Sequence, residues 1–372
     1  MKVFLLISIL SSLVLALSPY FYGINYWYFE KLSKEEFDLV KEALEDIPVD
    51  VIRIGGMWYD AKGIKTWVLR DFFDLCETLN ATPIVQIPLN GFSVKDSLDF
   101  VKKVRSIYDG RIIWSIGNEM DIYEDVNFDW IEKMNMEESF EKYEKILDGL
   151  ERIEKDPIVW GPDLSWKWRP WMVGDWTTPF LKRFEDRIDA FSIHRYPFRY
   201  VLRYSDVVRD VRAFYQEMKR LSRIGKPIAL TETNLSWDWK FCGKMSSEGD
   251  IAGLWLSSII LRSIVLDLYN VSVWSAVNDS CLSILVVKDG KLKERGTYRA
   301  LKIFKNVRGD VKDHMLSEYL DYAEVGRRIV AVNRSEKRLN FKLKGKIYSI
   351  DPMSACTYYK GKIEMCFKVK DF

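Results

Sequence analysis

The chain has 372 residues, of which 56 are lysine or arginine and 54 are aspartate or glutamate, so its formal net charge is +2. This balance excludes the strongly basic field that holds nucleic acid, and it excludes an acidic tail. With 48% hydrophobic residues the chain can bury a full core. Two histidines, His194 and His314, are too few for a multi-histidine metal site, and neither a phosphate-binding loop nor a dinucleotide fingerprint is present. We therefore expect no metal, no organic cofactor and no nucleic-acid partner.

The first eighteen residues have the pattern of a secretory signal peptide. Lys2 is followed by an apolar stretch over residues 3–17 that only serines interrupt, and small residues stand near its end. The stretch is shorter than the ~20 residues of a comfortable transmembrane span. An uncleaved anchor or a first core element is the alternative. We predict that residues 1–18 are removed, that the protein is secreted, and that no stable membrane span remains after cleavage.

Glutamine is rare in this sequence. It occurs only at Gln86 and Gln216, whereas glutamate and lysine are abundant. Because this bias is typical of proteins that work at high temperature, we expect a thermophilic source.

Five cysteines in a secreted chain leave one unpaired if two disulfides form. Cys356 and Cys366 flank a Lys-Gly-Lys run and would face each other if these three residues form a hairpin loop. Cys242 and Cys281 both lie in loops late in the chain and are the second candidate pair. Cys76 stands in a helical pattern among phenylalanine and leucine residues, so we expect it to be a buried thiol.

Apolar runs alternate with amphipathic helical patterns along most of the chain. The predicted strands cover residues 22–27, 50–55, 83–88, 112–116, 158–161, 190–193, 228–231 and 271–275. The predicted helices cover residues 34–46, 67–79, 94–108, 137–154, 178–184, 206–221, 250–268 and 298–306. Continuous apolar strands separated by helices indicate a parallel sheet covered on both faces. Eight such units predict an α/β protein with a (β/α)8 TIM barrel over residues 19–309. The alternative, an open doubly wound sheet, lacks its usual glycine turn.

The pattern changes after Gly309. Alternating apolar and polar residues over 329–333, 339–343, 346–350 and 363–369 indicate antiparallel strands with polar turns between them. We predict a small β-rich module over residues 310–372. At roughly 60 residues it is marginal as an independent unit, so we expect it to pack on the barrel.

Two of the predicted barrel strands run directly into a glutamate. The fourth strand ends in Trp-Ser-Ile-Gly-Asn-Glu, which places Glu119 after it, and the seventh ends in Ala-Leu-Thr-Glu, which places Glu232. Barrels of this kind place their chemistry at the C-terminal ends of the strands. A single glutamate there could be a helix-entry or surface residue, but two on strands 4 and 7 favour a functional pair.

Two opposed carboxylates are what cleavage of a glycosidic bond needs. One donates a proton to the departing oxygen, and the other attacks the anomeric carbon or activates water. A separation of ~5 Å gives a covalent intermediate and retention of configuration, whereas ~6.5–9.5 Å leaves room for water and gives inversion.

The Ile-Gly-Asn-Glu run at Glu119, with the Thr-Glu run at Glu232, resembles the retaining glycoside hydrolases of clan A, including families 5 and 39. Arg53 within Ile-Arg-Ile-Gly looks like the arginine of the clan's second strand. The Ser-Ile-His-Arg-Tyr-Pro run of strand 6 is similar to the clan's His-x-Tyr motif, and a tryptophan of strand 8 matches as well. A C-terminal β module recurs in families 30, 39, 51 and 79, where an N-terminal strand commonly completes it. We expect no such strand here, because the first predicted barrel strand begins almost at the predicted cleavage site.

The resemblance implies a retaining hydrolase of β-glycosidic bonds in poly- or oligosaccharides, with Glu119 as acid/base and Glu232 as nucleophile. Arg53 and Tyr196 are expected beside Glu232, where their charge and hydroxyl would favour its ionised form. Glu119 must begin protonated, which needs an apolar surrounding that raises its pKa. Asn118 is suited to hold the sugar 2-hydroxyl, an interaction that strengthens in the transition state.

The supporting residues also have plainer interpretations. Arg53 could belong to a structural ion pair, and Tyr196 and His194 could be ordinary loop packing. Because a lone histidine is usually a satisfied hydrogen-bonding residue, we expect His194 to position other groups.

Tryptophan is abundant, with 14 in the chain, and it clusters in the loops after the predicted strands. The clustered residues are Trp160, Trp166, Trp168, Trp171, Trp176, Trp237 and Trp239. A flat ring offers an apolar face to the C–H side of a sugar, although we expect about half of these rings to pack in the core. Trp166 and Trp237 are the candidates for sugar binding, and Trp274 is the candidate floor of the reacting-sugar site. Further candidates that follow strands and could bind hydroxyls are Asn25, Trp27 and Asp163.

Two other functions remain open. A barrel that binds carbohydrate without cleaving it would share the fold, although the presence of both glutamates argues against it. An esterase or peptidase with a Ser-His-Asp triad would rest on His194 alone, and the sequence has no Gly-x-Ser-x-Gly elbow.

Overall fold

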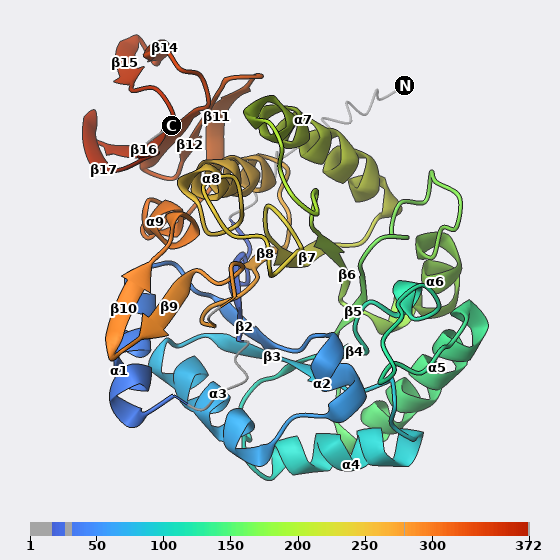
Figure 1. The fold of residues 1–372 in the computed structure, drawn as a ribbon. Coiled ribbons are helices and arrows are strands. Elements are labelled where there is room, and N and C mark those ends of the chain that lie inside the picture. The colour runs from blue at the N-terminus through green and yellow to red at the C-terminus, as the bar shows by residue number, and fades with distance from the viewer. Residues whose placement is uncertain (1–16, 27–31, 279, 371–372) are drawn as a thin grey trace, which may run out of the picture.

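The computed structural model describes residues 17–26, 32–278 and 280–370 (Figure 1). Its centre is a closed barrel of eight parallel strands in the order β1 to β8. The strands are β1 Tyr22–Tyr26, β2 Val51–Ile54, β3 Thr82–Ile87, β4 Ile113–Ile116, β5 Ile158–Leu164, β6 Ala190–Arg195, β7 Ile228–Thr233 and β8 Asn270–Val273. The predicted (β/α)8 barrel is confirmed, with strand ends that differ from the prediction by at most three residues.

Helices surround the barrel on its outside (Figure 1). They are α1 Lys34–Leu44, α2 Met57–Lys62, α3 Thr66–Thr78, α4 Val94–Arg105, α5 Met136–Ile153, α6 Thr177–Phe184, α7 Tyr204–Leu221, α8 Asp250–Val265 and α9 Gly296–Lys302. Helices α1 and α5 begin with complete capping boxes at Ser33 and Asn135, which satisfy backbone N–H groups of the first turn. The short helix α2, directly after β2, was not predicted.

The inward residues of the barrel change in character along each strand. At the N-terminal end they form an apolar cluster, made of Tyr20, Val51, Ile84, Ile113, Trp160, Ala190 and Ala229. Successive side chains on one face of a strand stand two residues apart. Two positions further along, five of these strands carry buried polar side chains, namely Arg53, Gln86, Ser115, Ser192 and Thr231. The apolar layer therefore closes the bottom of the barrel and leaves a polar layer below its C-terminal mouth.

The C-terminal part is an antiparallel β module, as predicted. Its five-stranded sheet has the order β11-β12-β13-β16-β17, and a two-stranded hairpin pairs β14 with β15. The strands are β11 Val311–Leu316, β12 Leu320–Val325, β13 Arg328–Asn333, β14 Leu339–Leu343, β15 Lys346–Ile350, β16 Ser354–Tyr359 and β17 Lys362–Lys368. Strands β11, β12 and β16 were not predicted. Neither was a small hairpin before α9, formed by β9 Leu285–Lys288 and β10 Lys291–Glu294.

The module packs on helix α8, beside which Figure 1 draws it. Fourteen of the 16 residues of α8 are buried. Arg262 of α8 forms an ion pair of 2.8 Å with the fully buried Asp321 of β12, and Arg334 pairs with the same carboxylate at 2.8 Å. Arg334 also donates a hydrogen bond to Ser258 of α8. The expected packing of module on barrel is confirmed, and the contact contains a buried ion cluster in which two arginines share the carboxylate of Asp321.

The cysteines form the two predicted pairs. Cys242 and Cys281 are joined with a Cα–Cα distance of 5.3 Å, and Cys356 and Cys366 with one of 4.2 Å. The second pair faces across β16 and β17, but the predicted three-residue loop is wrong: Tyr359 pairs with Lys362, which leaves a two-residue turn. Cys76 is a buried free thiol, as predicted.

Within the described ranges, no helix has both the length and the apolar character that crossing a membrane requires. Most of the predicted signal segment, residues 1–16, lies outside the described residues, and so does the sugar-binding candidate Trp27.

Candidate active site

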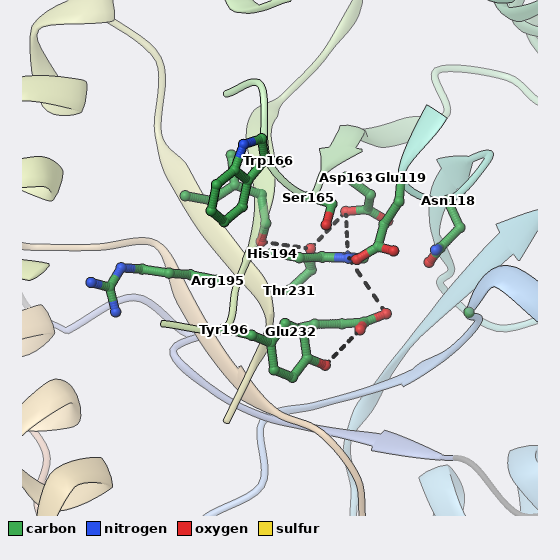
Figure 2. Close-up of polar contacts among 12 residues, drawn as sticks. Asn118, Glu119, Asp163, Ser165, Trp166, His194, Arg195, Tyr196, Thr231 and Glu232 are labelled. Atoms are coloured by element: carbon green, nitrogen blue, oxygen red, sulfur yellow. Dashed lines mark hydrogen bonds and ion pairs between the residues drawn. The ribbon is translucent and has the colours of Figure 1, made fainter. Parts of the chain in front are cut away.

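Glu119 and Glu232 come together at the C-terminal mouth of the barrel (Figure 2). Glu232 belongs to β7 itself, whereas Glu119 follows β4 in a sharp turn. Gly117 has φ +72° and Glu119 has φ +52°, so the backbone passes twice through the left-handed region that L side chains rarely adopt. The Glu119 N–H donates to the carbonyl of Asp163 at the end of β5, over 3.0 Å, which holds the turn in place.

The two carboxylates are close to each other. One oxygen of Glu119, one oxygen of Glu232 and a ring nitrogen of His194 all lie within 4.8 Å of one another. This spacing matches the ~5–5.5 Å of retaining glycosidases and is too short for the ~6.5–9.5 Å of inverting ones. The geometry therefore favours direct attack by one carboxylate over attack by a water held between them.

Both oxygens of Glu232 accept hydrogen bonds. Arg53 Nη1 donates to Oε1 over 2.6 Å, and the Tyr196 hydroxyl donates to Oε2 over 2.8 Å. These are the contacts predicted for Arg53 and Tyr196. Burial is the largest influence and raises the pKa of Glu232 above its usual value, while His194, Arg53 and Tyr196 act in the opposite direction. These charged and hydroxyl donors therefore oppose the effect of burial and favour the ionised form of Glu232.

The surroundings of Glu119 differ from those of Glu232. Its side chain is 15% exposed, and burial raises the pKa of its carboxyl to about 7. A hydrogen bond with the Ser165 side chain and the charge of Arg53 oppose this rise, and Asp163 adds to it. Arg53 contacts Glu232 but not Glu119. Because a positive charge next to a carboxylate favours its ionised form, Glu119 holds a proton more readily than Glu232.

Arg53 lies at the centre of the polar layer and is completely buried. Besides Glu232, its guanidinium donates to Asn25 Oδ1, Asn118 Oδ1 and Asp163 Oδ2 over 3.1, 2.9 and 3.0 Å. A buried guanidinium is stable only when its positive charge is paired. The carboxylates of Glu232 and Asp163 pair with the guanidinium of Arg53. Arg53 therefore sits beneath the two glutamates and contacts Glu232 and Asn118 directly.

The structure corrects the position of two candidates. Asn25 and Asp163 were predicted to bind hydroxyls, but neither side chain has any exposed surface. Asn25 donates to the Thr231 carbonyl and accepts from Arg53, and Asp163 accepts from Arg53 and from the Thr231 hydroxyl. Because all these contacts lie within the protein, the two residues orient Arg53 instead of facing a ligand.

His194 bridges the two glutamates. Its Nδ1 forms a 2.9 Å hydrogen bond with Oε1 of Glu119, and its Nε2 lies 3.6 Å from Oε1 of Glu232. Burial, the largest cause, lowers the pKa of the His194 ring and so favours its neutral form. The predicted positioning role has the required geometry, because the ring contacts the carboxyl of Glu119 directly.

The tryptophans divide as expected between core and surface. Trp160, Trp168 and Trp176 are buried, whereas Trp166 is 60% and Trp237 is 49% exposed. Trp166 follows β5 and Trp237 follows β7, both at the mouth that holds the glutamates. Trp274 follows β8 and is 9% exposed. Its backbone N–H donates a hydrogen bond to the carbonyl of Thr233 at the end of β7.

Sequence reasoning missed three residues of the site. Asp121, two positions after Glu119, is a fully buried carboxylate that accepts three backbone N–H groups of the loop after β5. Ser165 hydrogen-bonds Glu119, and the Thr231 hydroxyl donates to Asp163 over 2.6 Å. Their proximity to the predicted strand ends was visible in the sequence, but their partners were not.

Among the residues that the structure describes, two groups have side chains close enough together to hold a metal ion. In the first, formed by Glu119, His194 and Glu232, the guanidinium of Arg53 already lies 2.6 Å from Glu232, so a cation would be placed beside a fixed positive charge. The second consists of Cys242, Glu248 and Cys281, and its two sulfurs are joined in a disulfide. Neither donor set fits a metal centre.

No protein-family model matches this chain, and no curated protein sequence matches it. Solved structures are similar to it. An α-L-arabinofuranosidase from Thermotoga maritima is 17% identical with a TM-score of 0.66, and the match covers 96% of each chain. A family 44 xyloglucanase from Paenibacillus polymyxa is 12% identical with a TM-score of 0.60, covering 91% of this chain and 96% of that one. A family 30 subfamily 8 xylanase from Clostridium acetobutylicum is 13% identical with a TM-score of 0.58, covering 87% and 84%.

At identities of 12–17% these likenesses establish the fold. The resemblance to the (β/α)8 barrels of clan A is confirmed at that level, and the similar structures are glycoside hydrolases of families 51, 44 and 30. The sequence motifs had suggested families 5 and 39. Because the first match covers 96% of this chain, the shared architecture includes the C-terminal β module as well as the barrel.

Proposed function

We propose that this protein is a retaining glycoside hydrolase that cleaves β-glycosidic bonds in poly- or oligosaccharides by double displacement. The observation that carries the proposal is the pair formed by Glu119 and Glu232, whose oxygens lie within 4.8 Å in environments that favour different protonation states. Glycosidases need this combination of a proton donor and a charged nucleophile.

In the first step the Glu232 carboxylate attacks the anomeric carbon, and the bond to the leaving oxygen breaks. Glu119 transfers its proton to that oxygen, so a free sugar hydroxyl departs and a glycosyl ester of Glu232 remains. In the second step the Glu119 carboxylate removes a proton from water. The water oxygen attacks the anomeric carbon, Glu232 is released, and the net result is retention of configuration.

The neighbouring residues support these steps. Arg53 and Tyr196 keep Glu232 ionised and aligned before attack and stabilise it again when it leaves. Since Arg53 occupies the amide oxygen of Asn118, the amide NH2 group is the part directed to a sugar 2-hydroxyl. Trp274, Trp166 and Trp237 provide flat apolar surfaces for sugar rings.

Trapping of the covalent intermediate tests the proposal. Dinitrophenyl 2-deoxy-2-fluoro glycosides of glucose, mannose, xylose and arabinofuranose should add one fluoroglycosyl unit to Glu232. The fluorine slows both steps, whereas the activated leaving group speeds only the first, so the covalent intermediate accumulates. Peptide mass mapping identifies the labelled residue. A protein that binds oligosaccharides but takes no label would be the non-catalytic barrel, and sensitivity to serine-directed inhibitors would favour an esterase or peptidase.

The sugar panel also decides the linkage. The similar structures include an α-L-arabinofuranosidase, a xyloglucanase and a xylanase, so the proposed preference for β-linked substrates is measured against α-L-arabinofuranosides in the same experiment.

The pH dependence of kcat/KM should be bell-shaped. Glu119 must carry a proton at the start, so activity should fall as pH rises through its pKa of about 7. Glu232 must be ionised, and its raised pKa places the acidic limb above the usual range for glutamate. Initial rates on an oligosaccharide between about pH 4 and pH 9 measure both limbs. Full activity retained well above neutral pH would contradict the proton-donor role of Glu119.

We also propose that the protein acts outside the cell, on the basis of the signal pattern over residues 1–18, and that its partner there is carbohydrate.

A further inference from the structure

The carboxylate of Asp121 holds the loop after β5. Its Oδ1 accepts the N–H of Ser165 over 2.9 Å, and its Oδ2 accepts those of Trp166 and Lys167 over 2.7 Å each. Three successive amides bound to one buried carboxylate form a rigid, charge-assisted anchor. The Lys167 carbonyl in turn accepts the N–H of Trp176, which ties the far end of the loop.

This anchor links the loop to the turn that carries Glu119. Asp121 stands two residues after Glu119, and the Glu119 N–H binds the carbonyl of Asp163 just before the loop. Ser165 reaches back and hydrogen-bonds the Glu119 side chain. The backbone of Trp166 is therefore fixed relative to the proposed proton donor.

The ring of Trp166 nevertheless stands in solvent, with 60% of its surface exposed. The guanidinium of Arg169 lies 5.6 Å from this ring and 4.2 Å from the ring of the fully buried Trp168, and it pairs with Glu217. A large apolar ring that is supported by neighbours and held outward by a fixed backbone provides a surface for the C–H face of a sugar.

The position of the ring indicates which sugar it binds. In Figure 2, Trp166 and Asn118 lie on opposite sides of the Glu119–Glu232 pair. Asn118 is assigned to the sugar that forms the covalent intermediate, so the opposite side belongs to the leaving group. The contact between Ser165 and Glu119 agrees with this, because the proton donor must face the departing oxygen.

Building on the proposed function, we propose that Trp166 is the binding platform for the sugar on the leaving-group side, and that Asp121 is the positioning residue that fixes it. The substrate is then a chain or oligosaccharide with a sugar, not a small aglycone, beyond the cleaved bond.

Comparison of two substrates tests the platform. Trp166→Ala should lower kcat/KM about tenfold or more on an oligosaccharide, mainly by raising KM. On an aryl glycoside of the same sugar, which has no leaving-group sugar, the value should stay within about twofold. Trp166→Phe should restore part of the loss. The control is Tyr319→Ala, which removes another exposed aromatic ring from the β module and should change neither substrate.

The role of Asp121 is tested by a double-mutant cycle. Asp121→Asn should lower kcat/KM more on the oligosaccharide than on the aryl glycoside, whose smaller loss would come from the Ser165–Glu119 contact. Combining it with Trp166→Ala should add little to the oligosaccharide-specific loss, because that part acts through one ring. Fully additive losses, or equal losses on both substrates, would overturn the assignment. If the wild-type protein hydrolyses no glycoside and takes no fluoroglycosyl label, the proposed function itself fails, which is a separate outcome from a Trp166 variant that treats both substrates alike.

Discussion

Replacement of Glu232 by glutamine should reduce turnover by on the order of 10⁴-fold or more, because the nucleophile that forms the covalent intermediate is lost. Glutamine has the same size, its amide oxygen can still accept from Arg53, and its NH2 group can donate to the Tyr196 hydroxyl, so the fold should persist although Arg53 then has Asp163 as its remaining counter-ion. Steady-state rates, the melting temperature and oligosaccharide affinity together separate loss of chemistry from loss of structure. Glu151→Gln, an exposed change on α5, is the matched control.

A smaller replacement at the same position gives a stereochemical readout. Glu232→Ala leaves space beside Arg53, where azide can enter and attack the anomeric carbon of an activated β-glycoside. The product should be the α-glycosyl azide, with inverted configuration, identified by nuclear magnetic resonance. Near-normal activity of either variant without azide would move the nucleophile to another residue.

Replacement of Glu119 by alanine should affect substrates according to how badly their leaving group needs a proton. Natural sugar leaving groups should react roughly 10²–10⁴-fold more slowly, the range that general acid catalysis contributes. An activated aryl glycoside should still form the glycosyl-enzyme quickly, but this intermediate should accumulate because the same residue must deprotonate water in the second step. Burst kinetics and intact mass measure that accumulation.

Azide and pH complete the test of Glu119. Azide needs no general base, so it should speed the second step of Glu119→Ala and yield the β-glycosyl azide, the opposite configuration to the Glu232 result. The alkaline limb near pH 7 should disappear, since that limb reports Glu119 losing its proton. Equal losses on activated and natural substrates, with the limb unchanged, would show that Glu119 is not the acid/base.

The barrel and the glutamate pair were predictable because both depend on local patterns. Each barrel strand is a short apolar run buried on both faces, and a helix pattern follows it, so periodicity indicated the fold. Three strands of the β module were missed for the opposite reason. Strand β11 is mostly exposed and carries Lys-Asp-His in its middle, and β12 buries the charge of Asp321 on one face, so neither shows the expected alternation.

The sequence could not predict which side chains of the site are exposed and which are buried. Asn25 lies within β1 and Asp163 within β5, and both are completely buried beneath the mouth of the barrel, where each hydrogen-bonds Arg53. Likewise Trp166 and Trp168 are two residues apart in one loop, but one ring is exposed and the other is fully buried. Strand ends locate a residue along the barrel axis, whereas its accessibility depends on partners contributed by distant segments.

The burial of helix α8 on all sides has a consequence for how the protein folds. A helix that is apolar around its whole circumference needs neighbours on every face, and the β module supplies those on the side away from the barrel. Since α8 connects β7, which carries Glu232, to the closing strand β8, the stability of the catalytic strand depends on the module. We therefore expect the two parts to fold as one cooperative unit, so that deletion of the module should unfold the barrel edge next to Glu232.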